Sequence, residues 1–363
     1  MSKIKNKIDY LFLFAVLSLL AIGGLMIFSA SPVMGMKYGD SFYFIKRHLF
    51  YLLLGLAAFY YGFKIDLETV KRHAQTIFII AVGSLALVFI PGVGRSVLGA
   101  SRWIELGFIS FQPSEFIKLA TVIFLAKWLT DKQIVIRDFF RGLLPPLMFF
   151  GVIGLLIIKQ PDLGTALTIG ATVFLMLFVA GAQIKQLAGL CLAGIIGVLG
   201  LSVTSPYRLR RLVAYLDPWK DPQGAGFQII QSLLAVGSGG VFGLGLGASK
   251  QKFYYLPQQF TDFIFAILCE ELGLIGGAAV VVLFITFAGR GFKIALSSND
   301  QFKVLLASGI VAWITIQAMI NIMVVVGIVP TTGIPLPFIS YGGTATIINL
   351  FAVGMVLNVS RKP

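Results

Sequence analysis

The segment Tyr10–Ala30, YLFLFAVLSLLAIGGLMIFSA, contains no charged side chain. A helix needs about 20 predominantly apolar residues to cross the hydrocarbon core of a bilayer, so this segment is long enough to span one. Comparable apolar runs follow along the chain, at residues 46–63, 74–91, 113–129, 143–159, 163–182, 187–204, 261–289, 303–328 and 341–359. The sequence therefore predicts an all-α polytopic membrane protein with about ten transmembrane helices.

The composition excludes a soluble protein. Of the 363 residues, 58% are hydrophobic and only 12% are charged, which is about half the charged fraction of a soluble chain. The net charge of +14 does not indicate a nucleic-acid partner, because the basic residues lie between apolar runs and not among exposed aromatic residues. In a membrane protein such charges set the topology and contact anionic lipids. We expect a membrane-embedded protein with no nucleic-acid partner.

The distribution of Lys and Arg predicts the orientation. About 16 basic residues, among them Lys3, Lys5, Lys7 and Lys362, lie in the terminal segments and alternate short loops, against about 7 in the opposite short loops. Because cytoplasmic loops carry the excess, both termini are expected in the cytoplasm. Residues 205–260 then form a large extracytoplasmic loop between the seventh and eighth helices, with structure of its own. Residues 1–363 are expected to form a single transmembrane domain.

Ionisable groups at membrane depth are functional candidates, because they are costly unless paired or hydrated. In the segment 112–118, Glu115 and Lys118 are three residues apart and lie on one helix face. Two interpretations stay open: a structural ion pair, or Lys118 holding a phosphate while Glu115 orients it. Glu270 and Glu271 follow in the eighth helix, about 12 Å deeper than its outer start, and we favour a structural role with polar partners.

Several outer helix starts carry polar residues. Asp162 opens the sixth helix and Asp262 the eighth, and each carboxylate is suited either to capping its helix or to lining a cavity. Residues 330–337 resist helix formation through repeated proline and glycine, and Ser340 begins the last helix. We predict that these starts converge on one outward-facing cavity. Basic residues on the same side suggest an anion-binding face: Arg95, Arg102, Lys118, Lys159, Arg208, Arg210 and Arg211.

These segments resemble the SEDS family (shape, elongation, division and sporulation), and its FtsW branch more than its RodA branch. The matching stretches are FSAS at 28–31, RW at 102–103, QPSE at 112–115, QPDLGT at 160–165, PYRLRR at 206–211, DPWKDP at 217–222, GAGFQ at 224–228, LP at 256–257, TDFIFA at 261–266, EELG at 270–273 and ISYGG at 339–343. They cover nearly the whole chain in order. Two positions depart from the family pattern: Phe260 replaces a frequent histidine, and Thr332 replaces a lysine frequent in FtsW.

The resemblance implies a peptidoglycan glycosyltransferase that polymerises lipid II on the outer face of the bacterial cytoplasmic membrane, with a class B penicillin-binding transpeptidase as partner. The family's essential outer-loop aspartate falls on Asp262. Our hypothesis makes Asp262 the general base for an inverting displacement of undecaprenyl pyrophosphate. The candidate residues for binding lipid II and the nascent glycan strand are Arg102, Glu115, Lys118, Asp162, Arg208, Arg210, Arg211 and Ser340.

The identity of any metal stays open, and a divalent cation (Mg²⁺ or Mn²⁺) is one way to assist the leaving group. We expect no nucleotide cofactor, because the glycine-rich segment 243–247 does not complete a phosphate-binding motif. We also expect no haem and no flavin. Two alternatives to the enzyme remain: a lipid II flippase without chemistry, and a non-catalytic scaffold for the transpeptidase.

Overall fold

A computed structural model describes residues 8–97, 100–107, 109–253 and 255–361, so Lys3, Lys5, Lys7 and Lys362 of the expected charge asymmetry lie outside it. Each of the ten expected segments contains a helix. These are α1 (Tyr10–Ala30), α3 (Tyr43–Lys64), α5 (Ala74–Leu87), α6 (Pro113–Asp131), α7 (Leu144–Lys159), α8 (Leu163–Val179), α9 (Ile184–Thr204), α12 (Ile264–Leu296), α13 (Gln301–Val325) and α14 (Gly343–Arg361). The all-α polytopic membrane fold is confirmed.

The count of ten membrane crossings remains a prediction. Within the described residues, six helices are long and apolar enough to cross a bilayer, or up to seven if α3 and the short helices before it form one bent span. Those short helices are α2 (Pro32–Gly35) and η1 (Met36–Tyr38), which meet α3 at an angle of 102°. The helices α5 and α8 are apolar but shorter.

The remaining elements lie in the connections. They are α4 (Leu67–Arg72), β1 (Gly94–Val97), β2 (Ala100–Leu106), β3 (Ile109–Phe111), η2 (Gln133–Val135), the π-helix η3 (Phe139–Leu143), α10 (Pro206–Leu216), η4 (Pro218–Lys220) and α11 (Phe227–Ser238). The strands form an antiparallel sheet in the order β1-β2-β3, which the sequence analysis did not predict. The expected structure within residues 205–260 is confirmed by α10, η4 and α11.

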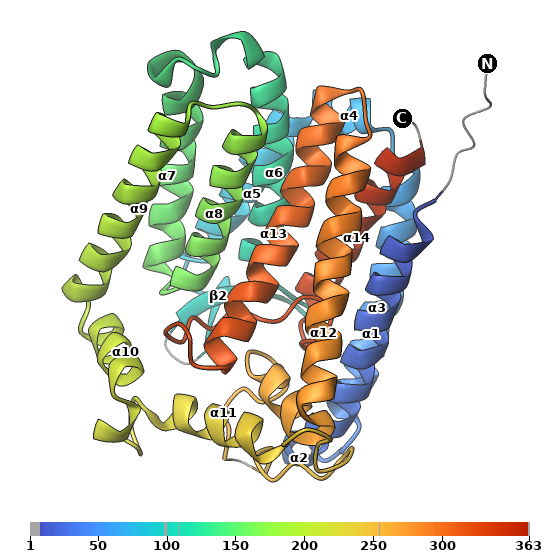
Figure 1. Cartoon of the computed structure of the whole chain (residues 1–363), viewed down its shortest axis with the longest axis vertical. Helices are drawn as coiled ribbons and strands as arrows, with labels where there is room; N and C mark the ends of the chain where they lie inside the picture. Colours follow the sequence, from blue (N-terminus) through green and yellow to red (C-terminus); the bar gives the residue numbers. More distant parts are fainter. Residues whose placement is uncertain (1–7, 98–99, 108, 254, 362–363) are drawn as a thin grey trace.

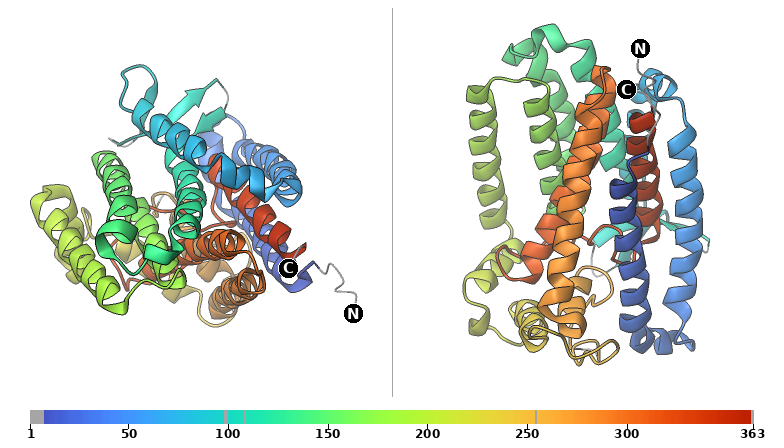
Figure 2. Two further views of the ribbon diagram at one scale, coloured as in Figure 1. Left: turned by 90° about the horizontal axis from the view of Figure 1, so that it is seen from above. Right: turned by 45° about the vertical axis from the view of Figure 1, so that its right-hand side comes forward.

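The helices are bundled along one direction, and the two ends of the bundle differ (Figures 1 and 2). α1 begins and α14 ends at the end that also carries α4. α2, α10 and α11 lie at the opposite end, and α11 runs across the bundle there. We call this opposite end the α11 end.

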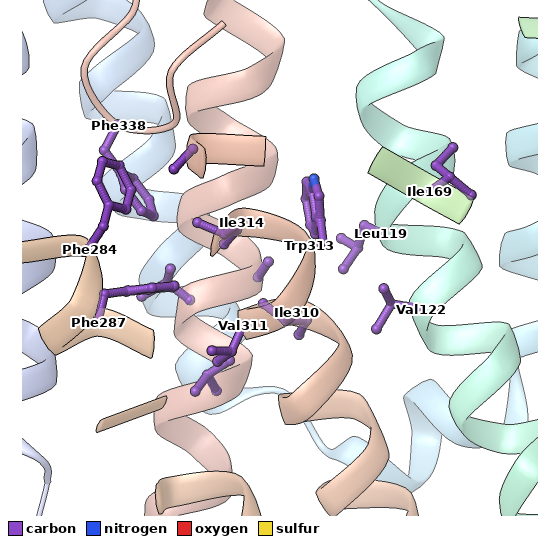
Figure 3. Close-up of a cluster of buried hydrophobic side chains, with 14 of the residues drawn as sticks. Leu119, Val122, Ile169, Phe284, Phe287, Ile310, Val311, Trp313, Ile314 and Phe338 are labelled. Carbon is purple, nitrogen blue, oxygen red and sulfur yellow. The ribbon is translucent and has the colours of Figure 1, made fainter. Parts of the chain in front are cut away.

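The core is built around α13. Trp313, Ile310 and Ile314 are almost fully buried between α6 and α12 (Figure 3). α3 and α14 approach closely, because a Cβ on Gly62 or Gly354 would overlap the backbone of the other helix. Small residues allow such close helix contact in membranes, where van der Waals packing and not water exclusion drives association.

α12 is not one straight helix but a hairpin of two arms, residues 264–272 and 274–296. Gly273 has φ 68° and ψ −165°, outside the helical region. A Cβ on Gly277 would lie 3.0 Å from Sγ of Cys269, although eight residues of straight helix would separate them by about 12 Å. The two arms therefore lie side by side, and the short arm turns back at Gly273.

Replacing Gly273 with alanine is expected to destabilise the fold strongly. The backbone conformation of Gly273 costs an L-residue about 1–3 kcal/mol, and a new Cβ would also overlap the backbone at Gly243. Thermal unfolding of the purified variant measures the loss. Gly289→Ala in the long arm is the matched control, since nothing lies within 4 Å of a Cβ there. Equal unfolding temperatures for the two variants would contradict the hairpin.

The acidic pair in α12 is buried and fully bonded at the end of the short arm. Glu271 accepts hydrogen bonds from Ser29 Oγ at 2.7 Å and from Lys252 Nζ at 3.1 Å. Glu270 accepts from the backbone amide of Lys250 at 2.9 Å and from Ser249 Oγ. The expected polar partners are confirmed, but the expected depth was wrong. Because the short arm turns back, the pair lies level with the last turn of α1, at the α11 end.

Candidate functional site

The loop that follows α13 is the meeting point of the candidate site. Residues 330–336 adopt neither helix nor strand, as their prolines and glycine predict. A Cβ on Gly164, at the start of α8, would touch Thr332 and Ile334 of this loop. Tyr341 donates its backbone amide to the Phe260 carbonyl at 2.9 Å. The starts of α8, α12 and α14 therefore meet at one loop, and the outward-facing cavity expected there stays a prediction.

Asp262 lies in the turn before α12. The expected capping role is wrong, because Phe263 is the N-cap residue and no side chain caps the helix. Within the described residues, the Asp262 carboxylate accepts no hydrogen bond and forms no ion pair. Its side chain is half-buried, and Oδ2 lies 3.6 Å from where a Cβ on Gly333 would stand. Among the described residues, the Asp262 carboxylate therefore stabilises no other group through a hydrogen bond or an ion pair.

Two guanidinium groups and a second carboxylate surround Asp262. Arg102 from β2 donates to the Gln160 and Pro161 carbonyls, and its Nη1 lies 3.8 Å from Asp162 Oδ2. Arg211 from α10 donates to the Thr331 carbonyl at 3.0 Å. Arg102 is thus bonded to the residues just before α8, whereas Arg211 is bonded to the loop beside Asp262. Asp162 is buried and caps α8 by accepting from the Thr165 amide at 3.1 Å, as one of its two interpretations predicted.

Burial sets the protonation of Asp262. The carboxyl keeps some exposed area but lies deep in the protein, and this desolvation raises the pKa of Asp262 from 3.8 to about 6. The positive charge of Arg102 opposes the rise, Asp162 adds to it, and Arg211 opposes it. A carboxylate with a pKa near the working pH is suited to accept a proton in a reaction.

Lys118 and Glu115 form the expected ion pair, at 2.7 Å, and both are buried in α6. Lys118 Nζ also donates to Gln317 Oε1 at 2.7 Å. Ser340 is bonded to backbone: it donates to the Thr261 carbonyl at 2.6 Å and accepts from the Leu336 amide at 2.7 Å. Lys118 thereby connects α6 to α13, and Ser340 connects the loop after α13 to the turn before α12.

The other basic candidates differ from Arg211. Arg208 donates to the carbonyls of Leu201 and Ile158, which ties α10 to the ends of α9 and α7. Arg210 is exposed on α10. The structure does not bring these two side chains to the Asp262 carboxylate, whereas Arg211 lies over the Tyr207 ring at 4.6 Å and reaches the loop.

The residues present do not fit a metal held by protein ligands alone. Across the described part of the chain, no three His, Cys, Asp or Glu side chains gather in one group. Of the two neighbouring carboxylates, Asp162 is already bonded to Thr165 and close to Arg102.

Two polar residues of the site were missed by the sequence analysis, Gln317 and Asn321 of α13. Asn321 Nδ2 donates both to the Asp262 carbonyl at 2.7 Å and to the Ile334 carbonyl at 2.8 Å. Both residues are uncharged amides within an apolar helix, four residues apart and therefore on one face. This spacing of two buried amides is the feature of the sequence that could have identified them.

Comparisons with known proteins agree over the whole chain. The chain is 49% identical to stage V sporulation protein E of Bacillus subtilis over 98% of both chains. It is 43% identical to a probable peptidoglycan glycosyltransferase FtsW of Geobacter sulfurreducens, over 98% of this chain and 96% of that protein.

Solved structures give the same result. A chain from a peptidoglycan synthase complex that coordinates polymerization and crosslinking is 30% identical, with a TM-score of 0.81 and 98% of both chains covered. The rod shape determining protein RodA of Thermus thermophilus is 28% identical, with a TM-score of 0.72 and coverage of 98% of this chain and 97% of that one. The family model for FtsW, RodA and SpoVE, described as "Cell cycle protein", matches residues 10–363. The chain therefore belongs to the FtsW/RodA/SpoVE family of cell cycle proteins.

Proposed function

We propose that the protein is a peptidoglycan glycosyltransferase that polymerises lipid II into glycan strands. The observation that carries the proposal is the Asp262 carboxylate, which is half-buried, accepts no hydrogen bond among the described residues and lies near Arg102 and Arg211. Relatives named as probable peptidoglycan glycosyltransferases support it, since they share 41–43% identity with this chain.

The proposed reaction is a single inverting displacement. A sugar hydroxyl of the acceptor lipid II attacks the anomeric carbon of the growing chain, and the bond from that carbon to undecaprenyl pyrophosphate breaks. Asp262 accepts the hydroxyl proton as the new glycosidic bond forms, which makes the weak nucleophile reactive. The leaving diphosphate gains negative charge, and Arg102 and Arg211 are the nearby cations suited to stabilise it.

The setting is the bacterial cytoplasmic membrane, with both termini in the cytoplasm. The α11 end, which carries α10 and α11, then faces outward. A class B penicillin-binding transpeptidase is the proposed partner, supported by the similarity to a chain of a peptidoglycan synthase complex. Polymerisation by this chain would supply the strands that such a partner crosslinks.

Three functions are separated by one reconstitution. Purified protein and its cognate transpeptidase are placed in vesicles with fluorescent lipid II, and both polymer and transbilayer movement of the lipid are measured. Polymer formation supports the proposed enzyme. Movement of lipid II without polymer would identify a flippase. An inactive wild-type protein that still binds the transpeptidase would identify a scaffold.

Polymerisation is expected to fall steeply as the pH drops through about 6, by about tenfold per pH unit at lower pH, because the protonated form of Asp262 cannot act as base. Initial rates between pH 5 and 8 at low substrate concentration test this. Unfolding does not explain such a loss. The pKa of Asp262 is about 6 in the folded protein and 3.8 in the unfolded chain, so this group makes the fold more stable as the pH falls from about 6 to 3.8. A flat profile between pH 5 and 7 would exclude Asp262 as the base.

A further inference from the structure

Three polar side chains follow one face of α13 at intervals of four residues: Trp313, Gln317 and Asn321. All three are buried, with about 1% of their surface exposed. Polar groups inside an apolar helix are costly unless they are bonded, so their partners indicate what they do.

The first partner is Lys118 of α6, whose ammonium is enclosed by protein. Its side chain is 3% exposed, and Nζ donates to Glu115 and Gln317, each at 2.7 Å. Nζ also lies 5.3 Å from the centre of the Trp313 ring, within the range of a cation–π contact. An ammonium has three N–H donors, and Glu115, Gln317 and the Trp313 ring are its three contacts. The geometry directs Lys118 at α13 and not at a bound diphosphate.

Lys118 fixes the orientation of the Gln317 amide. Because Oε1 accepts from Lys118 and from Trp313 Nε1 at 3.1 Å, the amide nitrogen must point the other way. Nε2 donates there to the Pro335 carbonyl at 2.9 Å. The charge on α6 is thereby connected to the irregular loop beside Asp262.

Asn321 completes the connection one turn later. Its amide nitrogen has two N–H donors, and they bond the Ile334 carbonyl of the loop and the carbonyl of Asp262 itself. Residues 330–336 have no regular secondary structure, so bonds from neighbouring elements fix the position of this backbone. Gln317 and Asn321 bond two successive carbonyls of it.

We propose that Lys118, Gln317 and Asn321 form a positioning relay that sets the backbone of Asp262 against the 330–340 loop. The relay rests on the proposed function, and it assigns Lys118 a positioning role in place of phosphate binding. Displacement of a catalytic group by about 1 Å costs about a hundredfold in rate. The relay therefore acts on the chemical step and not on lipid binding.

A double-mutant cycle separates positioning from phosphate binding. Lys118→Met, Gln317→Leu, the double variant and Asn321→Leu are each compared with wild type for kcat and KM of lipid II polymerisation, in complex with the transpeptidase. We expect Gln317→Leu and Asn321→Leu to lower kcat by about 10- to 100-fold with KM within about twofold. Lys118→Met should add less than about threefold in the Gln317→Leu background, because residues of one network are not additive.

The matched control is Asn358→Leu in α14. Asn358 Nδ2 also bonds two carbonyls of a neighbouring segment, those of Gly62 at 3.3 Å and Ile65 at 2.6 Å, but at the end of the bundle away from Asp262. This variant should lose similar stability and keep its kcat. Full multiplication of the Lys118 and Gln317 losses, or a raised KM for Lys118→Met, would overturn the relay and restore the phosphate-ligand role.

Hydrogen exchange tests the relay independently of polymerisation. Residues 258–263 and 330–340 should exchange faster in Gln317→Leu and Asn321→Leu, and at the wild-type rate in Asn358→Leu. If the wild-type protein makes no polymer, the proposed function fails while this measurement still decides the relay. Unchanged exchange in both segments would overturn it.

Discussion

The Asp262→Ala variant is expected to lose lipid II polymerisation by about 10²- to 10⁴-fold, which is the usual contribution of a general base. Its fold should be preserved, because among the described residues the Asp262 carboxylate accepts no hydrogen bond and caps no helix. Asn321 and Ser340 bond the backbone of this turn, which alanine keeps. Initial rates of polymer formation, together with thermal unfolding and transpeptidase binding, measure these effects.

Asp300→Ala is a matched control for the loss of a carboxylate. Asp300 caps α13 by accepting from the Phe302 amide at 2.9 Å, so its removal should cost about 1 kcal/mol of stability without a change in rate. The two variants thus have opposite profiles of activity and stability. An Asp262→Ala protein that polymerises at near the wild-type rate would exclude the proposed base.

The second large effect is expected for Lys252→Met, which should destabilise the fold by about 3–5 kcal/mol. Lys252 and Glu271 are both buried, and their Nζ–Oε1 distance is 3.1 Å. Removing the ammonium leaves two adjacent buried carboxylates without a neutralising charge, which is more costly than losing the pair altogether. Thermal unfolding in detergent or nanodiscs measures the change.

The double variant Lys252→Met/Glu271→Gln should recover part of the loss, because it removes one of the two uncompensated negative charges. Lys303→Met is the less buried counterpart: Lys303 and Asp300 are both partly exposed, their distance is 3.6 Å, and such a solvent-accessible pair contributes about 0–1 kcal/mol. If Lys252→Met unfolds at the same temperature as Lys303→Met, the acidic pair is not held in place by this lysine.

The sequence predicted those features that depend on long local patterns. The helix Tyr10–Ala30 has the bounds that its apolar run gives. The Glu115–Lys118 pair and the Asp162 cap follow from spacing and position within one helix. The sheet β1-β2-β3 was missed because its strands are short, include a register shift and lie in a segment between two apolar runs.

Features that depend on distant contacts were out of reach. Residues 264–296 are mostly apolar on both sides of Gly273, so composition does not distinguish a hairpin from a straight helix. Gly273 is one of several glycines there, and its turn follows from its position against Gly243. Asp262 was identified through a family resemblance. Gln317 and Asn321 are uncharged and lie far from Asp262 in the sequence, so nothing in the sequence connected them with it.

The hairpin in α12 also matches the protein to the thickness of its bilayer. A straight helix of 33 residues would be about 50 Å long, whereas the hydrocarbon core measures about 30 Å. Such a helix would have to tilt steeply or thicken the lipid around it. With the short arm turned back, residues 274–296 give about 34 Å, which fits the core at a modest tilt. The short arm then lies beside the start of the long arm, so its nine residues add no length to the span.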